Sequence, residues 1–148
     1  MPRLDYHGVG QKIVDILIAD VDLGAVRNIT LEESQEFGPE QTPWVNVRAV
    51  GFELPEAWQP IAAGTVGRHR LTFAIDCWEY QLDDSERASQ FRSDLVGKVL
   101  VALMRDRTLQ NTVQQATVTG GTFTQVAEDP NVRLCTMTVV VDARATTT

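Results

Sequence analysis

The chain has 148 residues and a formal charge of −7, with 43% hydrophobic and 22% charged residues. This size and balance predict one globular domain spanning residues 1–148. The negative charge disfavours proteins that wrap nucleic acid, because those bind phosphates through an excess of Lys and Arg. No apolar run approaches the ~20 residues of a membrane-spanning helix, and the N-terminus lacks a signal-peptide pattern. We therefore expect a soluble, unsecreted protein made in a cytoplasm.

The first part of the chain predicts one helix and two strands. Residues 9–21 have the helical pattern, and Gly24 is the expected stop. The apolar residues at helical spacing are Val9, Ile13, Ile16, Leu17 and Val21. Residues 25–32 predict a short strand, and residues 34–43 a turn-rich loop. Residues 44–54 alternate as a strand, with Val45, Val47 and Ala49 on one side. Residues 55–67 form a long excursion anchored by Trp58 and Ile61.

The middle of the chain has the strongest alternation. Within residues 68–80, Leu71, Phe73, Ile75 and Cys77 fall on one side of a long predicted strand. A long amphipathic helix follows, capped by Asp83, Asp84 or Ser85 and ending near residues 105–107. Its predicted inward face comprises Ala88, Phe91, Leu95, Val99, Ala102 and Leu103.

Two further strands complete the expected fold. Residues 112–129 are rich in Thr and Val, and Gly120 and Gly121 indicate a bulge or bend. Residues 132–145 predict the last strand, followed by a frayed tail at about residues 145–148. The residues that share one face of this last strand are Cys135, Met137, Val139 and Val141. The order predicts an α+β fold: a mostly antiparallel sheet with the N-terminal helix and the long helix packed on one face.

The residues that bear chemistry do not form a recognisable site. His7, His69, Cys77 and Cys135 have the ligand types of a zinc site but none of its short spacings. His69 and Cys77 would lie ~26 Å apart along one strand, too far to share a metal or act as a catalytic pair. We expect His69 near the exposed start of its strand, both cysteines as reduced core thiols, no metal, no cofactor and no enzymatic activity.

Candidate binding residues lie instead on the surface of the long strand. Trp78 and Tyr80 project from the side opposite Phe73, where either a loop covers them or a neighbouring subunit contacts them. For Trp58 the same two alternatives apply, cover by a loop or contact with a neighbouring subunit. Residues 68–70 form a small basic patch, which is either a solvated strand end or an ion-pair contact. The full set of candidate interface residues is Trp58, Arg68, His69, Arg70, Asp76, Trp78 and Tyr80.

The order of elements resembles the tail terminator, or tail completion, proteins of long-tailed bacteriophages along nearly the whole chain. The resemblance rests on the N-terminal helix, the "TPWVNV" strand after a Glu-rich loop, and the Pro-containing excursion. It also rests on "RLTFAIDCWEY" followed directly by "DDSERASQFRSDLVGKVLVALM", and on a closing hairpin with "CTMTVVVDAR". No single motif anchors the family's contact residues onto this sequence.

The resemblance implies a structural virion protein that forms a homo-oligomeric ring, typically a hexamer, on the head-proximal end of the tail tube. Such a ring stops tube growth and presents a surface to a head–tail connector or neck protein. Genomic DNA would pass through its lumen unbound, which suits an acidic chain. The alternatives are another neck or tail component, such as a head–tail adaptor or tail tube subunit, and a small ligand-binding α+β domain.

Overall fold

The computed structural model describes residues 5–26, 28–33, 41–53, 65–81, 84–110, 112–125 and 131–147, and the side chains of all of these except 65–68, 125 and 144–147. In chain order the elements are α1 (Tyr6–Ala19), the 3₁₀ helix η1 (Val21–Leu23), β1 (Asn28–Leu31), β2 (Trp44–Glu53), β3 (Thr65–Tyr80), α2 (Ser85–Arg105), β4 (Gln115–Gln125) and β5 (Val132–Thr147). Trp58 lies outside the described residues.

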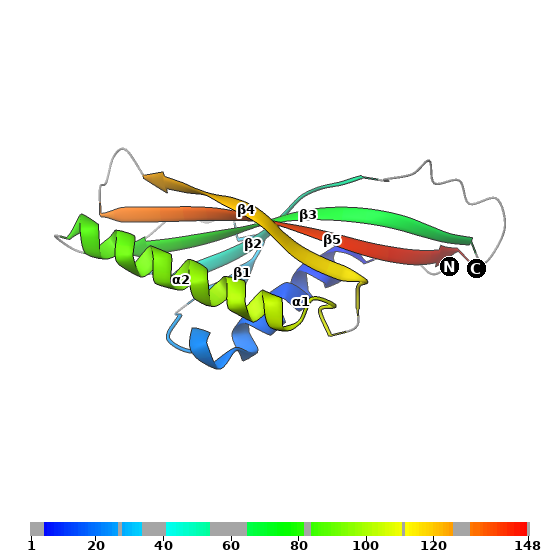
Figure 1. The fold of residues 1–148 in the computed structure, drawn as a ribbon, viewed down its shortest axis with the longest axis horizontal. Helices are drawn as coiled ribbons and strands as arrows, with labels where there is room; N and C mark the ends of the chain where they lie inside the picture. The colour runs from blue at the N-terminus through cyan, green and yellow to red at the C-terminus, as the bar shows by residue number, and fades with distance from the viewer. Residues whose placement is uncertain are drawn as a thin grey trace.

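The strands form one five-stranded sheet in the order β1-β2-β3-β5-β4. β1 runs parallel to β2, and every other neighbouring pair is antiparallel. Both helices lie on the same side of the sheet, with α1 beneath the β1–β2 side (Figure 1). The predicted α+β fold, with a mostly antiparallel sheet and two helices on one face, is confirmed. We call the face of the sheet that the helices cover the helix face, and we call the opposite face the far face.

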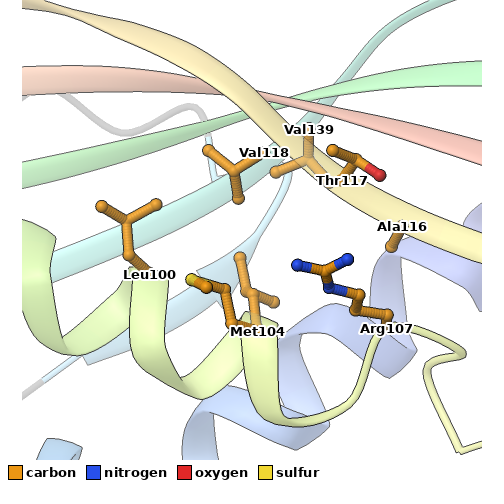
Figure 2. Close-up of a pocket in the computed structure, with 8 residues that line it drawn as sticks. Leu100, Met104, Arg107, Ala116, Thr117, Val118 and Val139 are labelled. Carbon is orange, nitrogen blue, oxygen red and sulfur yellow. The ribbon is translucent and has the colours of Figure 1, made fainter.

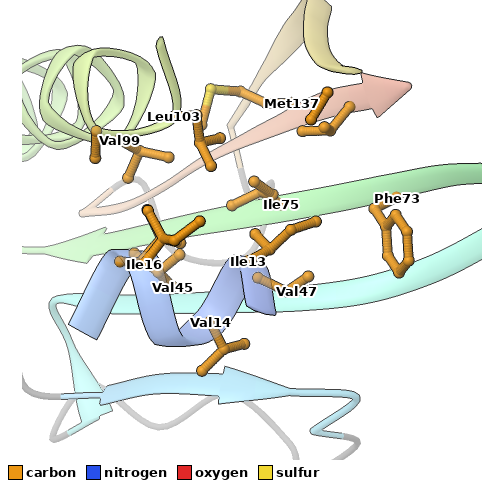
Figure 3. Close-up of a cluster of buried hydrophobic side chains, with 14 of the residues drawn as sticks. Ile13, Val14, Ile16, Val45, Val47, Phe73, Ile75, Val99, Leu103 and Met137 are labelled. Atoms are coloured by element: carbon orange, nitrogen blue, oxygen red, sulfur yellow. The ribbon is translucent and has the colours of Figure 1, made fainter. Parts of the chain in front are cut away.

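The core lies between the helices and the helix face (Figure 3). The side chains of Ile13, Ile75 and Val99 come from α1, β3 and α2 and are fully buried there. Phe73 is only 2% exposed, and its ring lies close to Gly10 of α1. Burying a side chain of this size stabilises a fold by roughly 1.5–3 kcal/mol, so these contacts hold both helices to the sheet.

Side-chain caps determine where both helices begin. The carboxylate of Asp5 accepts a hydrogen bond from the Gly8 amide at 3.0 Å, so α1 begins at Tyr6, before the predicted start. Asp84 accepts one from the Arg87 amide at 2.9 Å and caps α2, as one of the three predicted capping residues. Such a cap satisfies a helix amide that has no partner within the helix.

Two β-bulges interrupt the register of the sheet, one in β2 and one in β4. The register of β2 against β3 shifts between Ala49 and Gly51, and that of β4 against β5 shifts between Val118 and Gly120. The second shift is the predicted bulge. β1 pairs only with the first residues of β2, up to Val47. Among the described residues, no strand therefore pairs with the outer edge of β2 beyond that point.

Three expectations about exposure or order differ from the structure. Val21 is 90% exposed, because α1 ends at Ala19 and the 3₁₀ turn that follows breaks the helical phase. Phe91 is exposed rather than inward, and the Arg87 guanidinium lies 5.2 Å from its ring centre. β5 continues to Thr147, which pairs with Thr65, where the sequence indicated a frayed tail.

Candidate assembly surface

The predicted interface residues of β3 separate onto two faces. Arg70, Asp76, Trp78 and Tyr80 alternate with the buried core residues and so share the far face. Arg68 has the same parity and pairs in register with Arg144, but its side chain lies outside the described set. His69 alone belongs to the helix face. The structure therefore brings four of the predicted residues onto one surface.

Asp76 is held by partners within its own chain. One carboxylate oxygen accepts a hydrogen bond from Arg48 Nε at 2.8 Å, and the other accepts one from the Thr136 hydroxyl at 2.7 Å. The side chain is largely buried, whereas the Arg48 side chain is nearly half exposed. The hydrogen bond that Arg48 donates to Asp76 is also the main reason that the pKa of Arg48 is raised. Asp76 thus joins β2, β3 and β5 across the far face.

Trp78 continues this cross-strand network. Its ring stacks on Trp44 with centroids 6.1 Å apart, and the two residues are register partners on β3 and β2. The Trp44 indole donates to the Thr30 hydroxyl at 2.9 Å, and Thr30 donates to Asn46 at 2.8 Å. Trp44 is buried and Trp78 is half-buried. Part of the Trp78 ring is therefore still accessible to a neighbour.

His69 is buried, not near an exposed strand start as expected. The Tyr6 hydroxyl lies 2.7 Å from its Nδ1 atom, so α1 covers this histidine. Burial is also the cause of the raised pKa of the Tyr6 hydroxyl. The sequence pattern could not reveal this contact, because the two residues are 63 positions apart.

Arg70 also has carboxylate partners in its own chain. Its Nε donates to Asp142 at 3.2 Å, and its guanidinium lies 3.8 Å from the Glu53 carboxylate. These pairs connect β3 with both of its neighbours at half-exposed positions. Exposed pairs of this kind contribute roughly 0–1 kcal/mol, so they orient the side chains more than they stabilise the fold.

A surface that the sequence did not single out lies between α2 and the edge strand β4. Two adjoining cavities of ≈ 160 and ≈ 300 Å³ share Leu100 and Val118. We call them together the α2–β4 groove. Its lining residues are Val96, Leu100, Leu103, Met104 and Arg107 in or just after α2, Ala116 to Gly121 and Phe123 in β4, and Cys135, Met137 and Val139 in β5. Most of this lining is apolar (Figure 2). Phe123 is 59% exposed beside it.

Guanidinium groups lie along this groove without carboxylate partners among the described residues. Arg107 reaches into the space between α2 and β4 (Figure 2). Arg92 donates to the carbonyls of Thr124 and Leu134, both at 3.2 Å, and its guanidinium lies 4.6 Å from the Phe123 ring centre. Burial, and then the charge of Arg133, lower the pKa of Arg92. Arg92 Nε and Arg133 Nη1 are buried without a hydrogen-bond acceptor. This part of an acidic protein is therefore locally basic.

A second exposed apolar patch lies near the opposite edge of the sheet, on β2. Val50 and Phe52 of β2 are both largely exposed, and Phe52 is 61% exposed. The Phe52 ring lies 5.5 Å from that of Tyr6, and both residues line a shallow cavity of ≈ 160 Å³. Alternation alone could not distinguish these side chains from core residues, because their exposure follows from how far the helices extend along β2.

The described residues hold no cluster of three or more metal-binding side chains and no helix that could span a membrane. Cys77 and Cys135 are free and buried, and they are register partners on β3 and β5. Burial raises the pKa of both thiols, most strongly for Cys77, which disfavours the reactive thiolate.

No family model matches the chain, and no curated protein matches it. Among solved structures, the chain is similar to a chain of the "Virion of native gene transfer agent (GTA) particle". The identity is 12% and the TM-score 0.46, and the match covers 95% of this chain and 99% of that one.

Proposed function

We propose that the protein is a structural component of a phage-type virion, and specifically a tail terminator. Copies of the chain form a ring at the head-proximal end of the tail tube, stop tube growth and present a surface for the head–tail connector or neck. The order of helix, strands, long strand, long helix and hairpin supports the resemblance on which this rests.

The observation that carries the proposal is the presence of two unlike exposed patches near opposite edges of one sheet. A cyclic ring of identical subunits needs heterologous contacts, so each subunit must offer two different complementary surfaces. The patch around Phe52 lies on the β2 side, and the α2–β4 groove lies on the β4 side, with β3 and β5 between them. An isologous dimer would need only one self-complementary patch.

The charge of the chain agrees with a lumen through which DNA passes. The formal charge of −7 repels the phosphate backbone, so a ring of such chains would let DNA slide without holding it. The predicted interface residues Trp58, Arg68, His69, Arg70, Asp76, Trp78 and Tyr80 remain candidates for contact with the tube or the neck. Of these, the half-buried Trp78 and Tyr80 are the described residues best placed for such a contact.

The solution mass of the purified 16.4 kDa chain, measured by light scattering together with negative-stain images, tests the proposal. Closed rings that bind one end of purified tail tubes and stop their elongation would support a terminator. Open-ended tubes of the protein alone would instead indicate a tail tube subunit. A chain that stays monomeric and does not bind tube ends would overturn the proposal.

A further inference from the structure

Cys77 and Cys135 face each other across the centre of the sheet. They are the only cysteines of the chain, and they are register partners on the antiparallel strands β3 and β5. Both side chains lie on the helix face, among the buried core residues. In an antiparallel pair, residues directly opposite each other have Cα atoms about 4.5–5.5 Å apart, and a disulfide needs about 4.4–6.8 Å. The backbone of the two strands therefore holds the cysteines at a distance that a disulfide can span.

The side chains of the two cysteines are also close to each other. Burial is the main cause of the raised pKa of Cys77, and the neighbouring Cys135 is the next. Opposed Cβ atoms in a sheet lie about 4.5–5.5 Å apart, whereas those of a disulfide lie about 3.5–4.5 Å apart. A bond between the two sulfurs thus needs a small approach of the Cβ atoms and retains some strain. Strained disulfides have more oxidising potentials, so this bond should be easy to reduce again.

Cys135 is the cysteine that a small reagent can reach. The row of register partners across the sheet begins at the buried Val45 and ends at Phe123, which is 59% exposed, with the two cysteines between them. Cys135 lines the ≈ 300 Å³ cavity of the α2–β4 groove, and Cys77 does not line it. Hydrogen peroxide has two oxygen atoms and is little larger than a water molecule, so this cavity can hold it.

The charges around the two thiols favour the same order of reaction. Burial raises the pKa of Cys135, but the positive charge of Arg92 opposes the rise. The causes that act on Cys77 all raise its pKa. Cys135 is therefore the thiol that ionises more readily, and the thiolate is the form that attacks an oxidant.

We propose that Cys77 and Cys135 form a reversible disulfide, and that a peroxide entering the α2–β4 groove is the oxidant. The Cys135 thiolate attacks one peroxide oxygen, and the O–O bond breaks. The sulfur becomes a sulfenic acid, and the other oxygen takes up the Cys135 proton and leaves as water. The Cys77 sulfur then attacks the sulfenic sulfur, the S–O bond breaks, and the hydroxyl leaves as water with the Cys77 proton. Each sulfur gives up one electron, and one peroxide becomes two waters.

Such a bond would join the two central strands of the sheet covalently. The chain between the cysteines includes α2 and β4, so the bond closes a long loop and restricts the unfolded chain. The thiol reductants of a cytoplasm would keep the pair open, so the bond would form where these reductants are lacking. This inference goes beyond the proposed function and does not depend on it, because it concerns a single folded chain.

Peroxide treatment of the purified full-length protein, in native buffer after removal of reductant, tests the proposal. We expect both thiols to be lost, as counted after denaturation, and a non-reducing digest to contain a peptide that links Cys77 with Cys135. Dithiothreitol should restore both thiols, and the oxidised chain should melt about 5–10 °C above the reduced one. Thiols that survive in the folded protein, or links between chains, would overturn the disulfide. An oxidised chain that melts no higher than the reduced one would overturn its role in holding the strands together.

Two single variants test the order of the steps and serve as matched controls, because each lacks one partner of the bond. In Cys77→Ala, no thiol lies opposite Cys135, so peroxide should add oxygen to this sulfur, which mass spectrometry detects. In Cys135→Ala, the remaining Cys77 does not line the groove and should gain oxygen at least tenfold more slowly. Circular dichroism checks that both variants are folded. Faster oxidation of Cys77 than of Cys135 would overturn the assignment of Cys135 as the attacking residue.

Discussion

The central strand β3 and the edge strand β4 differ in how far their side chains are engaged within the chain. On β3, the far-face side chains have partners within the chain: Asp76 bonds Arg48 and Thr136, and Trp78 stacks on Trp44. On β4, Phe123 is exposed, and among the described residues its outer edge pairs with no strand. Polar and aromatic residues that look like an interface in the sequence are thus largely engaged internally, whereas the plain Thr-rich strand presents free surface.

Position in the sheet therefore decides whether a side chain is engaged within the chain or is accessible to another molecule. β3 has neighbours on both sides, so each of its far-face residues meets cross-strand partners. Within the part of the chain that the structure describes, β4 has one neighbouring strand, so its outer edge and its exposed Phe123 are available to another molecule.

Replacing the same residue type on each strand gives the largest contrast. Phe73 of β3 and Phe123 of β4 both point to the helix face, but only Phe73 is buried. Phe73→Ala should lower the free energy of unfolding by about 3–5 kcal/mol, because it leaves a cavity against α1. Phe123→Ala should cost no more than about 1 kcal/mol, mainly through its contact with Arg92.

Urea unfolding of both variants at subunit concentrations too low for assembly measures this contrast. Equal losses of stability would show that β4 is as well packed as β3, and would remove the reason to treat its surface as a free one. Phe123→Ala serves as the matched control for the loss of a phenyl ring.

The fold could be predicted because its signals are local. Alternation in β3 and helical spacing in α2 reflect which side chains meet the core, and the cap at Asp84 depends on residues next to it. Phe91 failed this prediction because Arg92 takes the neighbouring inward position, from which it donates to two carbonyls at the ends of β4 and β5. That role depends on strands more than thirty residues away, so helical spacing could not reveal it.

Glu79 is a buried acid on β3. Burial raises the pKa of Glu79 to about 7 from its ordinary value of 4.5; nearby Asp94 raises it further, whereas Lys98 lowers it. The folded chain therefore binds this proton more tightly than the unfolded chain does. The stability that Glu79 contributes is full below about pH 4.5 and is lost as the pH rises through about 7. Glu79→Gln should remove this loss and stabilise the protein at pH 8 by at most about 3 kcal/mol.

Denaturant unfolding of Glu79→Gln and the wild type between pH 4.5 and 8 isolates this group, because the other carboxylates are common to both. The stability difference should grow with pH. A difference that stays constant across the range would mean that Glu79 is hydrated in the folded chain.

The candidate site could be predicted only in part, since exposure depends on distant elements. Alternation predicted that Trp78 and Tyr80 project from the side of β3 opposite Phe73, and the structure places them there, on the same face as Asp76. It could not show that Arg48 and Thr136 would engage Asp76, because these partners lie 28 and 60 residues away. The α2–β4 groove was missed for a related reason: it exists only because α2 leaves part of β4 uncovered.

Trp78 gives an intermediate effect that separates folding from assembly. Trp78→Ala should cost about 1–2 kcal/mol in the isolated subunit, from the lost stacking on Trp44 and partial burial. We expect it to weaken binding to the tail tube or the neck more than it weakens folding. Thermal melts of the monomer, compared with binding to tail tubes, measure the two effects. A loss of stability equal to that of Phe73→Ala would show that Trp78 acts as a core residue.

The smallest effect distinguishes two adjacent glycines in β4. A Cβ atom at Gly121 would lie 3.1 Å from the Thr136 carbonyl oxygen, whereas one at Gly120 would meet nothing within 4 Å. Gly121→Ala should therefore destabilise the subunit by about 1 kcal/mol, because a backbone oxygen in the sheet cannot move aside easily. Gly120→Ala should be neutral or slightly stabilising, because alanine reduces the freedom of the unfolded chain. Unfolding of both variants in urea measures the difference. If Gly120→Ala were the more damaging, the bulge at Val118–Gly120 would need glycine for its backbone geometry, and β4 would be more constrained than its open surroundings indicate.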